Sequence, residues 1–272
     1  MQQKSLITSR ANPLIKSARA LRNRKERDRT GQFLVEGINH VGEATKAAWP
    51  VETIFYAPDL LESDFGRNII REENEKGVRC LSVSPDVMAS LADKENPQGI
   101  IAVVGQRAYK LDSFSPDNFK TGLALVSPQD PGNVGTILRT LDAVSSDGLF
   151  LLDGGVEPFH PSSVRASMGA VFWEPIIRES FSEFWKWADQ HHYRLIGTSA
   201  HALVDYRDLE IDNSPAIIVL GSEQKGLSKE QMDACDATVK LPMHGRTSSL
   251  NLAVAAGILL YSLVENQQFR SR

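Results

Sequence analysis

The chain is poor in cysteine and contains no long apolar run. Its 272 residues include two cysteines, Cys80 and Cys235, which lie in different halves of the sequence. This suggests no disulfide framework and no cysteine metal site, and buried thiols in a reducing cytoplasm are the simplest account. The longest apolar run, residues 252–264, is shorter than the roughly 18–20 residues that span a bilayer. The basic N-terminus also lacks the apolar stretch of a secretory signal. We therefore expect a cytoplasmic protein without membrane contact.

Two common ligand signatures are missing as well. Gly221 and Gly226 are spaced as in a phosphate-binding P-loop, but Leu227 and Ser228 stand where Lys and Ser or Thr are required. The six histidines show no metal-ligand spacing with cysteines or carboxylates. The sequence therefore predicts neither a P-loop nucleotide site nor a metal centre.

The composition is that of a globular protein with an uneven distribution of charge. Hydrophobic residues make up 42% and charged residues 24%, and the length is sufficient for two domains. Up to Thr30 there are nine basic and two acidic residues, whereas the rest of the chain has 21 basic and 32 acidic residues. Residues 1–30, which we call the basic arm, therefore carry a net charge of +7, and the rest of the chain carries −11. A basic segment on an acidic protein is typical of a part that contacts phosphate, although a solvated helix face has the same composition.

The first hundred residues alternate between helical patterns and short apolar runs. Asn12-Pro13 predicts a helix start, with Leu14, Ala18 and Leu21 on its apolar face and the basic residues turned outward. Strands predicted at 33–35, 51–56, 78–83 and 100–104 alternate with helices at 36–48, 61–75 and 85–91. This order indicates a compact α/β domain at residues 1–107, followed by a linker at 108–121.

Residues 122–272 continue the α/β pattern as a second domain. A strand at 123–126 leads through a loop to a helix at 134–144, for which Asn133 is the expected N-cap. Later, residues 216–227 and 239–256 each combine an apolar run with a loop of Gly, Ser and polar residues. In an open parallel sheet such loops lie at the carboxyl edge, where ligands bind. From spacing alone, two ordinary strand–loop–helix connections explain the pattern equally well.

Three motifs in this second domain carry a family resemblance. They are Asn133-Val134-Gly135-Thr136-Ile137-Leu138-Arg139-Thr140, then Gly221-Ser222-Glu223 with Gly226-Leu227, and then Leu241-Pro242-Met243, Gly245 and Ser249-Leu250-Asn251. In residue type and order they resemble the motifs of the SpoU, or TrmH-like, RNA ribose 2′-O-methyltransferases. The segments at residues 31–37 (GQFLVEG) and 160–170 (HPSSVRASMGA) also resemble sequences of this family.

The resemblance implies a fold, a cofactor and partners. Residues 122–272 are expected to form a SPOUT α/β-knot, a deep trefoil knot with a mostly parallel sheet. A small α/β ribosomal-protein-like RNA-binding domain is expected to precede it. The methyl donor is S-adenosyl-methionine, without a metal, and the acceptor is a ribose 2′-hydroxyl of structured RNA. Ribosomal RNA, most of all 23S rRNA, is favoured over tRNA because of the added N-terminal domain, and a homodimer through the catalytic domain is expected.

The motif positions define the expected site residues. Arg139 matches the arginine proposed to be catalytic in the family. Its ordinary pKa above about 12 makes it a poor general base, so it could instead orient the hydroxyl, bind a phosphate, or act as a base only in a strongly perturbed site. The other expected catalytic residues are Asn133, Ser249 and Asn251. The expected donor-binding residues are Thr198, Leu220, Gly221, Glu223, Leu241, Met243 and Leu250. The expected RNA contacts are Arg10, Lys16, Arg19, Arg22, Arg24, Lys25 and Arg165.

Three alternatives remain on the sequence alone. The first is a tRNA 2′-O-methyltransferase. The second is a non-catalytic RNA-binding or ribosome-assembly protein that retains the fold, against which the intact Asn133, Arg139, Ser249 and Asn251 argue. The third is a methyltransferase that acts on a small molecule or a protein, which the basic arm disfavours.

Overall fold

The structure is a computed structural model that describes residues 6–93, 95–210 and 212–270. Lys4, which belongs to the basic arm, lies outside the described residues. The chain forms two compact units. The first unit comprises Met1–Arg107 and Phe159–Phe172, and the second comprises Ala108–Pro158 and Trp173–Arg272. Within the described residues, no helix is long and apolar enough to cross a membrane.

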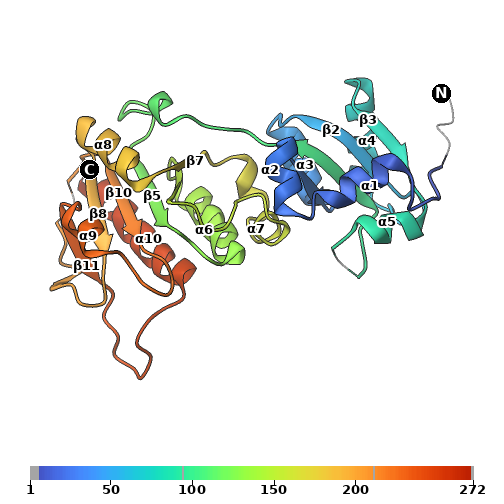
Figure 1. Cartoon of the computed structure of the whole chain (residues 1–272). Helices are drawn as coiled ribbons and strands as arrows, with labels where there is room; N and C mark the ends of the chain where they lie inside the picture. Colours follow the sequence, from blue (N-terminus) through green and yellow to red (C-terminus); the bar gives the residue numbers. More distant parts are fainter. Residues whose placement is uncertain (1–5, 94, 211, 271–272) are drawn as a thin grey trace. The chain divides into compact units, whose positions relative to one another are not determined.

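The first unit is built on a mixed sheet of four strands (Figure 1). The strand order is β1-β4-β2-β3. Strand β4 is antiparallel to both β1 and β2, whereas β2 and β3 are parallel. Every residue of β4 is buried, which explains its uninterrupted apolar sequence. The strands are β1 (Gln32–Glu36), β2 (Val51–Tyr56), β3 (Arg79–Ser82) and β4 (Ile100–Gly105).

Helices supply the rest of the core of this unit. On one face of the sheet, Ile15, Val87 and Met88 from α1 and α5 pack with Phe55 and Ile101 of β2 and β4. Because side chains alternate along a strand, Phe33 and Ile54 point to the opposite face. The helices are α1 (Pro13–Ala20), α2 (Arg24–Thr30), α3 (Ile38–Lys46), α4 (Asp64–Glu75), α5 (Pro85–Leu91) and α7 (Pro161–Ala166), with a 3-10 turn η2 (Ala170–Phe172).

The segment Phe159–Phe172 is an integral part of the first unit, although it follows a strand of the second unit in sequence. The rings of Phe159 and Phe172 pack with Phe33 and Trp49, with the Phe33 and Phe159 ring centroids 4.6 Å apart. The indole N–H of Trp49 donates to the Phe172 carbonyl at 2.8 Å. A buried aromatic cluster with a satisfied indole group fixes this segment to the unit.

The helix predicted near the N-terminus is two helices in the structure. The Asn12 side chain caps α1 as predicted, accepting from the Leu14 N–H at 2.9 Å. The buried face, however, contains Ile15 with Ala18 and Leu21, whereas Leu14 is 38% exposed. The prediction for Leu14 was therefore wrong by one position, because the apolar stripe of so short a helix does not specify its rotation uniquely.

A break separates α1 from α2, and Arg27 stabilises it. The Arg27 guanidinium is buried and donates to the carbonyls of Leu21 and Arg22, each at 2.7 Å. These are carbonyls that the end of a helix leaves without an intrahelical partner. Gly31 then ends α2 with φ 65°, a left-handed conformation that glycine adopts readily. One of the basic residues expected to face outward is thus an internal structural residue.

The second unit contains a sheet of seven strands in which every described pairing is parallel. The strand order is β7-β6-β5-β10-β8-β11-β9. The predicted mostly parallel α/β architecture is therefore confirmed. The strands are β5 (Thr121–Val126), β6 (Gly148–Leu152), β7 (Ile176–Glu179), β8 (Arg194–Thr198), β9 (Val204–Asp205), β10 (Ala216–Leu220) and β11 (Ala237–Lys240).

Helices pack on the apolar surfaces of this parallel sheet. Phe184 and Trp187 of α8 pack with Phe150, Ile217 and Val219 in one core cluster. The alternate strand residues point to the other face, and there α10 packs against α6 and against β5 and β10. The helices are α6 (Pro131–Val144), α8 (Phe181–Gln190), α9 (Lys229–Asp233) and α10 (Leu252–Arg270), with a 3-10 turn η1 (Leu111–Ser113).

Candidate active site

The motif residues of the second unit gather at the carboxyl ends of neighbouring strands. Strand β10 pairs with β5 and β8, and β8 pairs with β11. Thr198 ends β8, Leu220 ends β10, and Leu241 follows the last residue of β11. The chain runs outward from β5 to β6 and β7 and then returns to strands on the other side of β5. This reversal places a topological switch point between β5 and β10, at the carboxyl ends of these strands, where open α/β sheets bind ligands.

A chain of hydrogen bonds joins residues of the three sequence motifs. The Asn133 Nδ2 donates to Glu223 Oε1 at 3.1 Å, and the Asn251 Nδ2 donates to Asn133 Oδ1 at 2.9 Å. Glu223 also accepts from the backbone N–H of Gln129 at 3.1 Å and from that of Asp130 at 3.4 Å. The loop after β10 is thus tied to the start of α6, and α6 to the start of α10.

The two asparagines have different roles at their helices. Asn133 lies in the first turn of α6 and is buried, so the prediction that it caps the helix was wrong. The N-cap is Asp130, whose Oδ1 accepts from the Gly132 N–H at 2.7 Å, and Pro131 follows it. Asn251 does lie at a helix start, because its Oδ1 accepts from the Ala253 N–H at 2.9 Å. Asn133 is therefore free to use its amide for the link between Glu223 and Asn251.

Gly221 closes the loop after β10 on itself. A Cβ at Gly221 would lie 2.0 Å from the carbonyl carbon of Gly226 and 2.2 Å from the Leu227 nitrogen. The Gly226 N–H donates to the Ser222 carbonyl at 2.9 Å, and Gly226 itself has φ 65°. The close backbone approach at Gly221 is thus an approach of the loop to its own far end. This tight turn positions Glu223.

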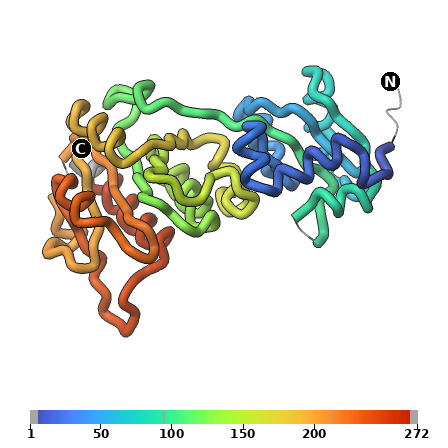
Figure 2. Tube along the Cα trace, in the orientation of Figure 1, coloured from blue at the N-terminus to red at the C-terminus, as the bar shows by residue number. Residues whose placement is uncertain are grey.

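The segment between β11 and α10 extends away from the sheet (Figure 2). Leu241 and Met243 are half-buried, whereas Ser249 is exposed and Leu250 is 37% exposed. Ser249 contributes its carbonyl to a hydrogen bond from the Thr247 hydroxyl at 2.9 Å. Ser249 and Leu250 therefore precede Asn251 without joining its amide chain among the described residues.

Arg139 lies on the exposed side of α6. It is six residues after Asn133, which places the two about 240° apart around the helix axis, and Asn133 is buried while Arg139 is exposed. The Arg139 side chain makes no hydrogen bond or ion pair with any described residue. Thr140, the next residue, lies against α10, since its Cγ2 is 3.9 Å from the place of a Cβ at Gly257. Arg139 is thus a cationic group directed to solvent beside the α6–α10 contact.

Two groups with raised pKa values, Glu174 and Cys235, precede β7 and β11 in the chain and so lie at the opposite, amino edge of the sheet. Burial raises the pKa of Glu174 to about 8, and the charges of Asp142 and Asp147 add to the shift. Burial likewise raises the pKa of the Cys235 thiol to about 12. Two hollows of this unit lie near the amino end of β8, and Tyr193 and Asp236 line both of them. In the described part of the chain, no group of three or more His, Cys, Asp or Glu is placed to hold a metal ion.

Comparison with known proteins adds to this geometry. Residues 120–261 match the SpoU rRNA Methylase family, and residues 12–102 match the MRM3-like substrate binding domain. The chain belongs to the SpoU family. The family resemblance of the three motifs is thereby confirmed.

Relatives within the SpoU family cover almost the whole chain. The 23S rRNA (uridine(2479)-2′-O)-methyltransferase of Streptomyces viridochromogenes is 33% identical over 96% of this chain and 92% of its own length. The 23S rRNA (guanosine(2553)-2′-O)-methyltransferase RlmP of Bacillus subtilis is 32% identical over 94% of this chain and 98% of its own. The AdoMet-bound rRNA methyltransferase of Sinorhizobium meliloti has a TM-score of 0.88 at 33% identity, covering 96% of this chain and 97% of that one.

The basic residues expected to contact RNA differ in their contacts within the first unit. Arg10 pairs with Asp86, Arg24 with Asp28, and Arg165 with Asp93. By contrast, Lys16, Arg19 and Lys25 form no ion pair with any described residue. Arg22 donates to the Ala92 carbonyl. Among the described residues of the arm, Lys16, Arg19 and Lys25 are thus uncompensated cations without a side-chain partner.

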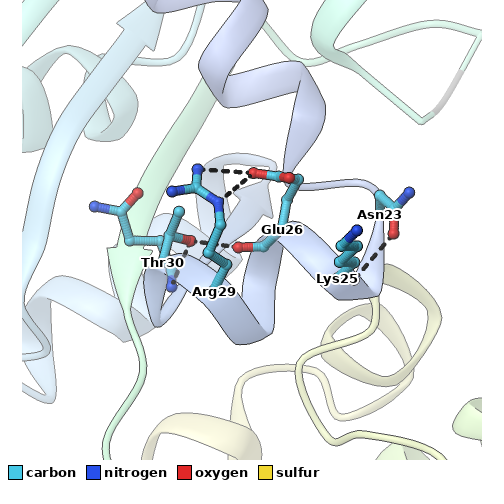
Figure 3. A network of polar contacts seen from close by, with 6 residues as sticks. Asn23, Lys25, Glu26, Arg29 and Thr30 are labelled. Carbon is cyan, nitrogen blue, oxygen red and sulfur yellow. Dashed lines mark hydrogen bonds and ion pairs between the residues drawn. The ribbon is translucent and has the colours of Figure 1, made fainter.

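Helix α2 shows how local contacts reduce the charge of the arm (Figure 3). The Arg29 guanidinium donates to Glu26 Oε2 through Nε at 3.0 Å and Nη2 at 2.8 Å. The Thr30 hydroxyl donates to the Glu26 carbonyl at 2.7 Å. Asn23 caps the helix by accepting from the Lys25 N–H at 2.9 Å, while the Lys25 ammonium group is exposed to solvent. Sequence reasoning missed these pairings, although the three-residue spacing of Glu26 and Arg29 is a usable signal.

Proposed function

We propose that this chain transfers a methyl group from S-adenosyl-methionine to a ribose 2′-hydroxyl of 23S ribosomal RNA. The observation that carries the proposal is the hydrogen-bonded chain Glu223–Asn133–Asn251, which joins all three motifs at a switch point of the parallel sheet. Its membership in the SpoU family supports the reaction class. The names of the Streptomyces and Bacillus relatives support ribosomal RNA as the substrate.

The donor fits the strand ends of β10, β8 and β11. Backbone groups at Thr198, Leu220, Gly221 and Leu241 lie where strand pairing ends, so they offer polar contacts to an adenine and an amino-acid group. The half-buried Leu241 and Met243, with Leu250, supply apolar walls. When bound there, the sulfonium donor provides an electrophilic methyl group. Glu223 fixes the loop after β10 through its hydrogen bonds to backbone and to Asn133.

Arg139 is proposed as the residue that contacts the RNA acceptor. Its exposed guanidinium has no described partner, so its N–H donors are available to the ribose hydroxyl or the adjacent phosphate. A guanidinium offers N–H donors and no acceptor, so Arg139 does not take up the hydroxyl proton. Its contribution is then to align the hydroxyl with the methyl group and to stabilise developing negative charge on the oxygen. Asn133, Ser249 and Asn251 would position this arrangement.

The catalytic unit is proposed to act as a homodimer. Val254 and Tyr261 are each about half exposed, and their spacing of seven residues places them on the same face of α10. Leu250, which is also exposed, precedes the same helix. Large apolar side chains aligned on one helix face favour burial by a partner. In a dimer through this face, Arg139 on the adjoining α6 would approach the partner subunit. Analytical ultracentrifugation of wild type and Tyr261→Asp tests this, with a shift toward monomer expected for the variant.

We further propose that the first unit binds the RNA and that the protein works in the cytoplasm, where ribosomal RNA is made into particles. The match of residues 12–102 to a substrate binding domain and the uncompensated cations Lys16, Arg19 and Lys25 support this role. The linker at 108–121 and a trefoil knot in the catalytic domain belong to the same proposal. The knot would make the donor pocket rigid, because the strand-end loops are then held by threaded chain.

The experiment is transfer of labelled methyl from S-adenosyl-methionine to RNA from cells that lack this gene. Free 23S rRNA, intact ribosomal particles and tRNA are tested in parallel with wild type, Arg139→Ala and the control Arg178→Ala, which changes an exposed arginine of β7. We expect label at one 2′-O position of 23S rRNA. Arg139→Ala should lower the rate by at least about 100-fold while donor binding persists, and Arg178→Ala should retain activity.

Three results would contradict parts of this proposal. Label in tRNA alone would change the substrate. Donor binding without transfer to any RNA or particle would favour the assembly-factor alternative. Full activity of Arg139→Ala would remove Arg139 from the catalytic group.

A further inference from the structure

A pocket in the first unit lies outside the candidate active site. It contains about 520 Å³ of empty space, open solvent at its mouth included. We call it the Glu36 pocket. All its lining residues belong to the first unit: Arg22, Leu34, Glu36, His40, Leu91, Asp93, Ile101, Pro161, Val164 and Arg165.

The floor of the Glu36 pocket is apolar. Leu91, Ile101 and Val164 are buried and come from α5, β4 and α7 respectively. Leu34 of β1 and Pro161 of α7 complete the apolar lining. Aliphatic side chains around a concave site suit a flat ring, which they can contact on its faces while its edge stays available for hydrogen bonds.

One carboxylate oxygen in this apolar setting has no hydrogen-bond donor. Glu36 is the last residue of β1, and its Oε2 accepts from the Asp93 N–H at 2.7 Å. Its Oε1 is buried and has no hydrogen-bond partner among the described residues. A desolvated carboxylate oxygen without a donor is costly, so a ligand that brings N–H groups to Glu36 would gain by satisfying it.

Two arginines stand at the mouth of the pocket. Arg165 Nη1 pairs with Asp93 Oδ2 at 2.8 Å, and Arg22 Nη2 donates to the Ala92 carbonyl. These contacts orient both guanidinium groups, yet each guanidinium has five N–H donors and uses few of them here. The mouth therefore offers preoriented donors for acceptor atoms or phosphate, while the interior offers a carboxylate acceptor.

We propose that the Glu36 pocket binds one unpaired guanine base of the RNA substrate. This inference rests on the proposed function only in taking RNA as the ligand. Guanine presents two adjacent donors, N1–H and the N2 amino group, to a carboxylate, and it presents O6 and N7 as acceptors for arginine. Adenine, cytosine and uracil each place an acceptor next to their single donor group on that edge, and this acceptor would face the Glu36 carboxylate unfavourably. The pocket thus adds base specificity to the charge of Lys16, Arg19 and Lys25.

The test measures binding of fluorescent RNA hairpins that carry one bulged nucleotide: G, A, C, U or inosine. The protein is the full chain as wild type, Glu36→Gln, and the matched control Glu52→Gln, which changes an exposed glutamate of β2 in the same sheet. Wild type and Glu52→Gln should bind the G hairpin about tenfold more tightly than the A, C and U hairpins. Glu36→Gln should bind all of them alike. Inosine, which lacks the 2-amino group, should bind wild type more weakly than guanine.

The outcomes separate this inference from the proposed reaction. Equal binding of all hairpins to wild type, or a guanine preference that persists in Glu36→Gln, overturns the pocket assignment. The inosine comparison uses wild type only, so it remains decisive if Glu36→Gln does not fold. A guanine preference without methyl transfer to any RNA leaves the pocket standing and removes the reaction. Methyl transfer without any guanine preference does the opposite. Absence of binding to every hairpin overturns the pocket assignment, while the labelled-methyl experiment decides the reaction.

Discussion

The two units place their polar side chains in different ways. In the second unit all strands are parallel, so their carboxyl ends share one edge, and the backbone turns that follow β5, β10, β8 and β11 collect there. In the first unit β4 is antiparallel to its two neighbours, so its carboxyl end lies at the opposite edge from those of β1, β2 and β3. Its pocket is assembled instead from side chains of five segments, around residues 22, 36, 93, 101 and 165. One site is made chiefly by backbone geometry and the other by side-chain charge.

The largest effect is expected from a change in the backbone turn at Gly221 of the second unit. Gly221→Ala would force a Cβ to within 2.0 Å of the Gly226 carbonyl carbon, which is backbone and cannot rotate away. We expect a loss of about 3 kcal/mol or more in the free energy of unfolding, together with loss of donor binding. Urea denaturation and calorimetric titration of S-adenosyl-methionine measure both. The control Gly226→Ala meets nothing within 4 Å and carries only the strain of φ 65°, about 1 kcal/mol. Equal effects of the two variants would refute the steric argument.

The second prediction concerns a buried carboxyl group, Glu174, that belongs to neither site. Glu174 has a pKa raised to about 8, mainly by burial and then by Asp142 and Asp147. The folded state therefore binds more protons than the unfolded state from about pH 4.5 to 8, and stability falls as the pH rises through that window. Glu174→Gln removes the titrating group. Relative to wild type, it should gain about 1–3 kcal/mol between pH 5 and 8.

Thermal and urea unfolding at several pH values test this gain. Glu183→Gln serves as the control, because that glutamate is exposed on α8 and its removal should change the free energy of unfolding little. A difference between Glu174→Gln and wild type that stays constant from pH 5 to 8 would show that Glu174 does not titrate in this window.

The third prediction asks whether side chains also couple the motifs of the second unit. Asn133→Ala and Asn251→Ala each remove one partner of a 2.9 Å amide contact, and each should cost about 1–2 kcal/mol in the free energy of unfolding. The double variant should cost less than the sum, with a coupling of about 0.5–2 kcal/mol. Pairing Asn133→Ala with Asn118→Ala, whose side chain closes a separate turn at Ser115, should be additive. Additivity of Asn133 and Asn251 would mean that the link contributes nothing to stability.

The same contrast explains what the sequence could and could not predict. In a parallel sheet all strands run in the same direction, so every loop that follows a strand lies at the same edge. The motif loops of residues 221–227 and 241–251 could therefore be assigned to one edge from their order in the chain alone. The exact capping residue was missed because Asp130 and Asn133 are both plausible caps, and Pro131 after Asp130 is the signal that decides between them. The carboxamide chain through Asn133 depends on rotamers that no spacing rule specifies.

The first unit was less predictable for a physical reason. Its helix α7 comes from a segment more than fifty residues beyond β4 in sequence, so no local pattern could bring Arg165 next to Asp93. Leu14 and Ile15 are both apolar, and only packing against α5 selects Ile15. Likewise, composition counts Arg10 and Lys16 as equal charges, whereas the structure pairs only Arg10 with a carboxylate among the described residues.

That last distinction gives the fourth prediction, which has the smallest expected effect. If the first unit contacts RNA through charge, the slope of log binding constant against log salt counts the phosphates that it neutralises. Lys16→Ala should reduce the magnitude of this slope by about one unit for any RNA sequence, because an unpaired ammonium group is lost. Arg10→Ala should reduce it less, because the Asp86 carboxylate already compensates Arg10, and that hydrogen bond and charge also raise the pKa of Arg10. Fluorescence anisotropy between about 50 and 200 mM salt, a range in which such slopes are resolved, measures both.

Asp86→Asn completes the design: it releases Arg10 and should make the slope steeper than that of wild type. If Arg10→Ala and Lys16→Ala have equal effects and Asp86→Asn has none, the ion pair does not persist when RNA binds, and the charge of the arm is then better counted from sequence than from structure.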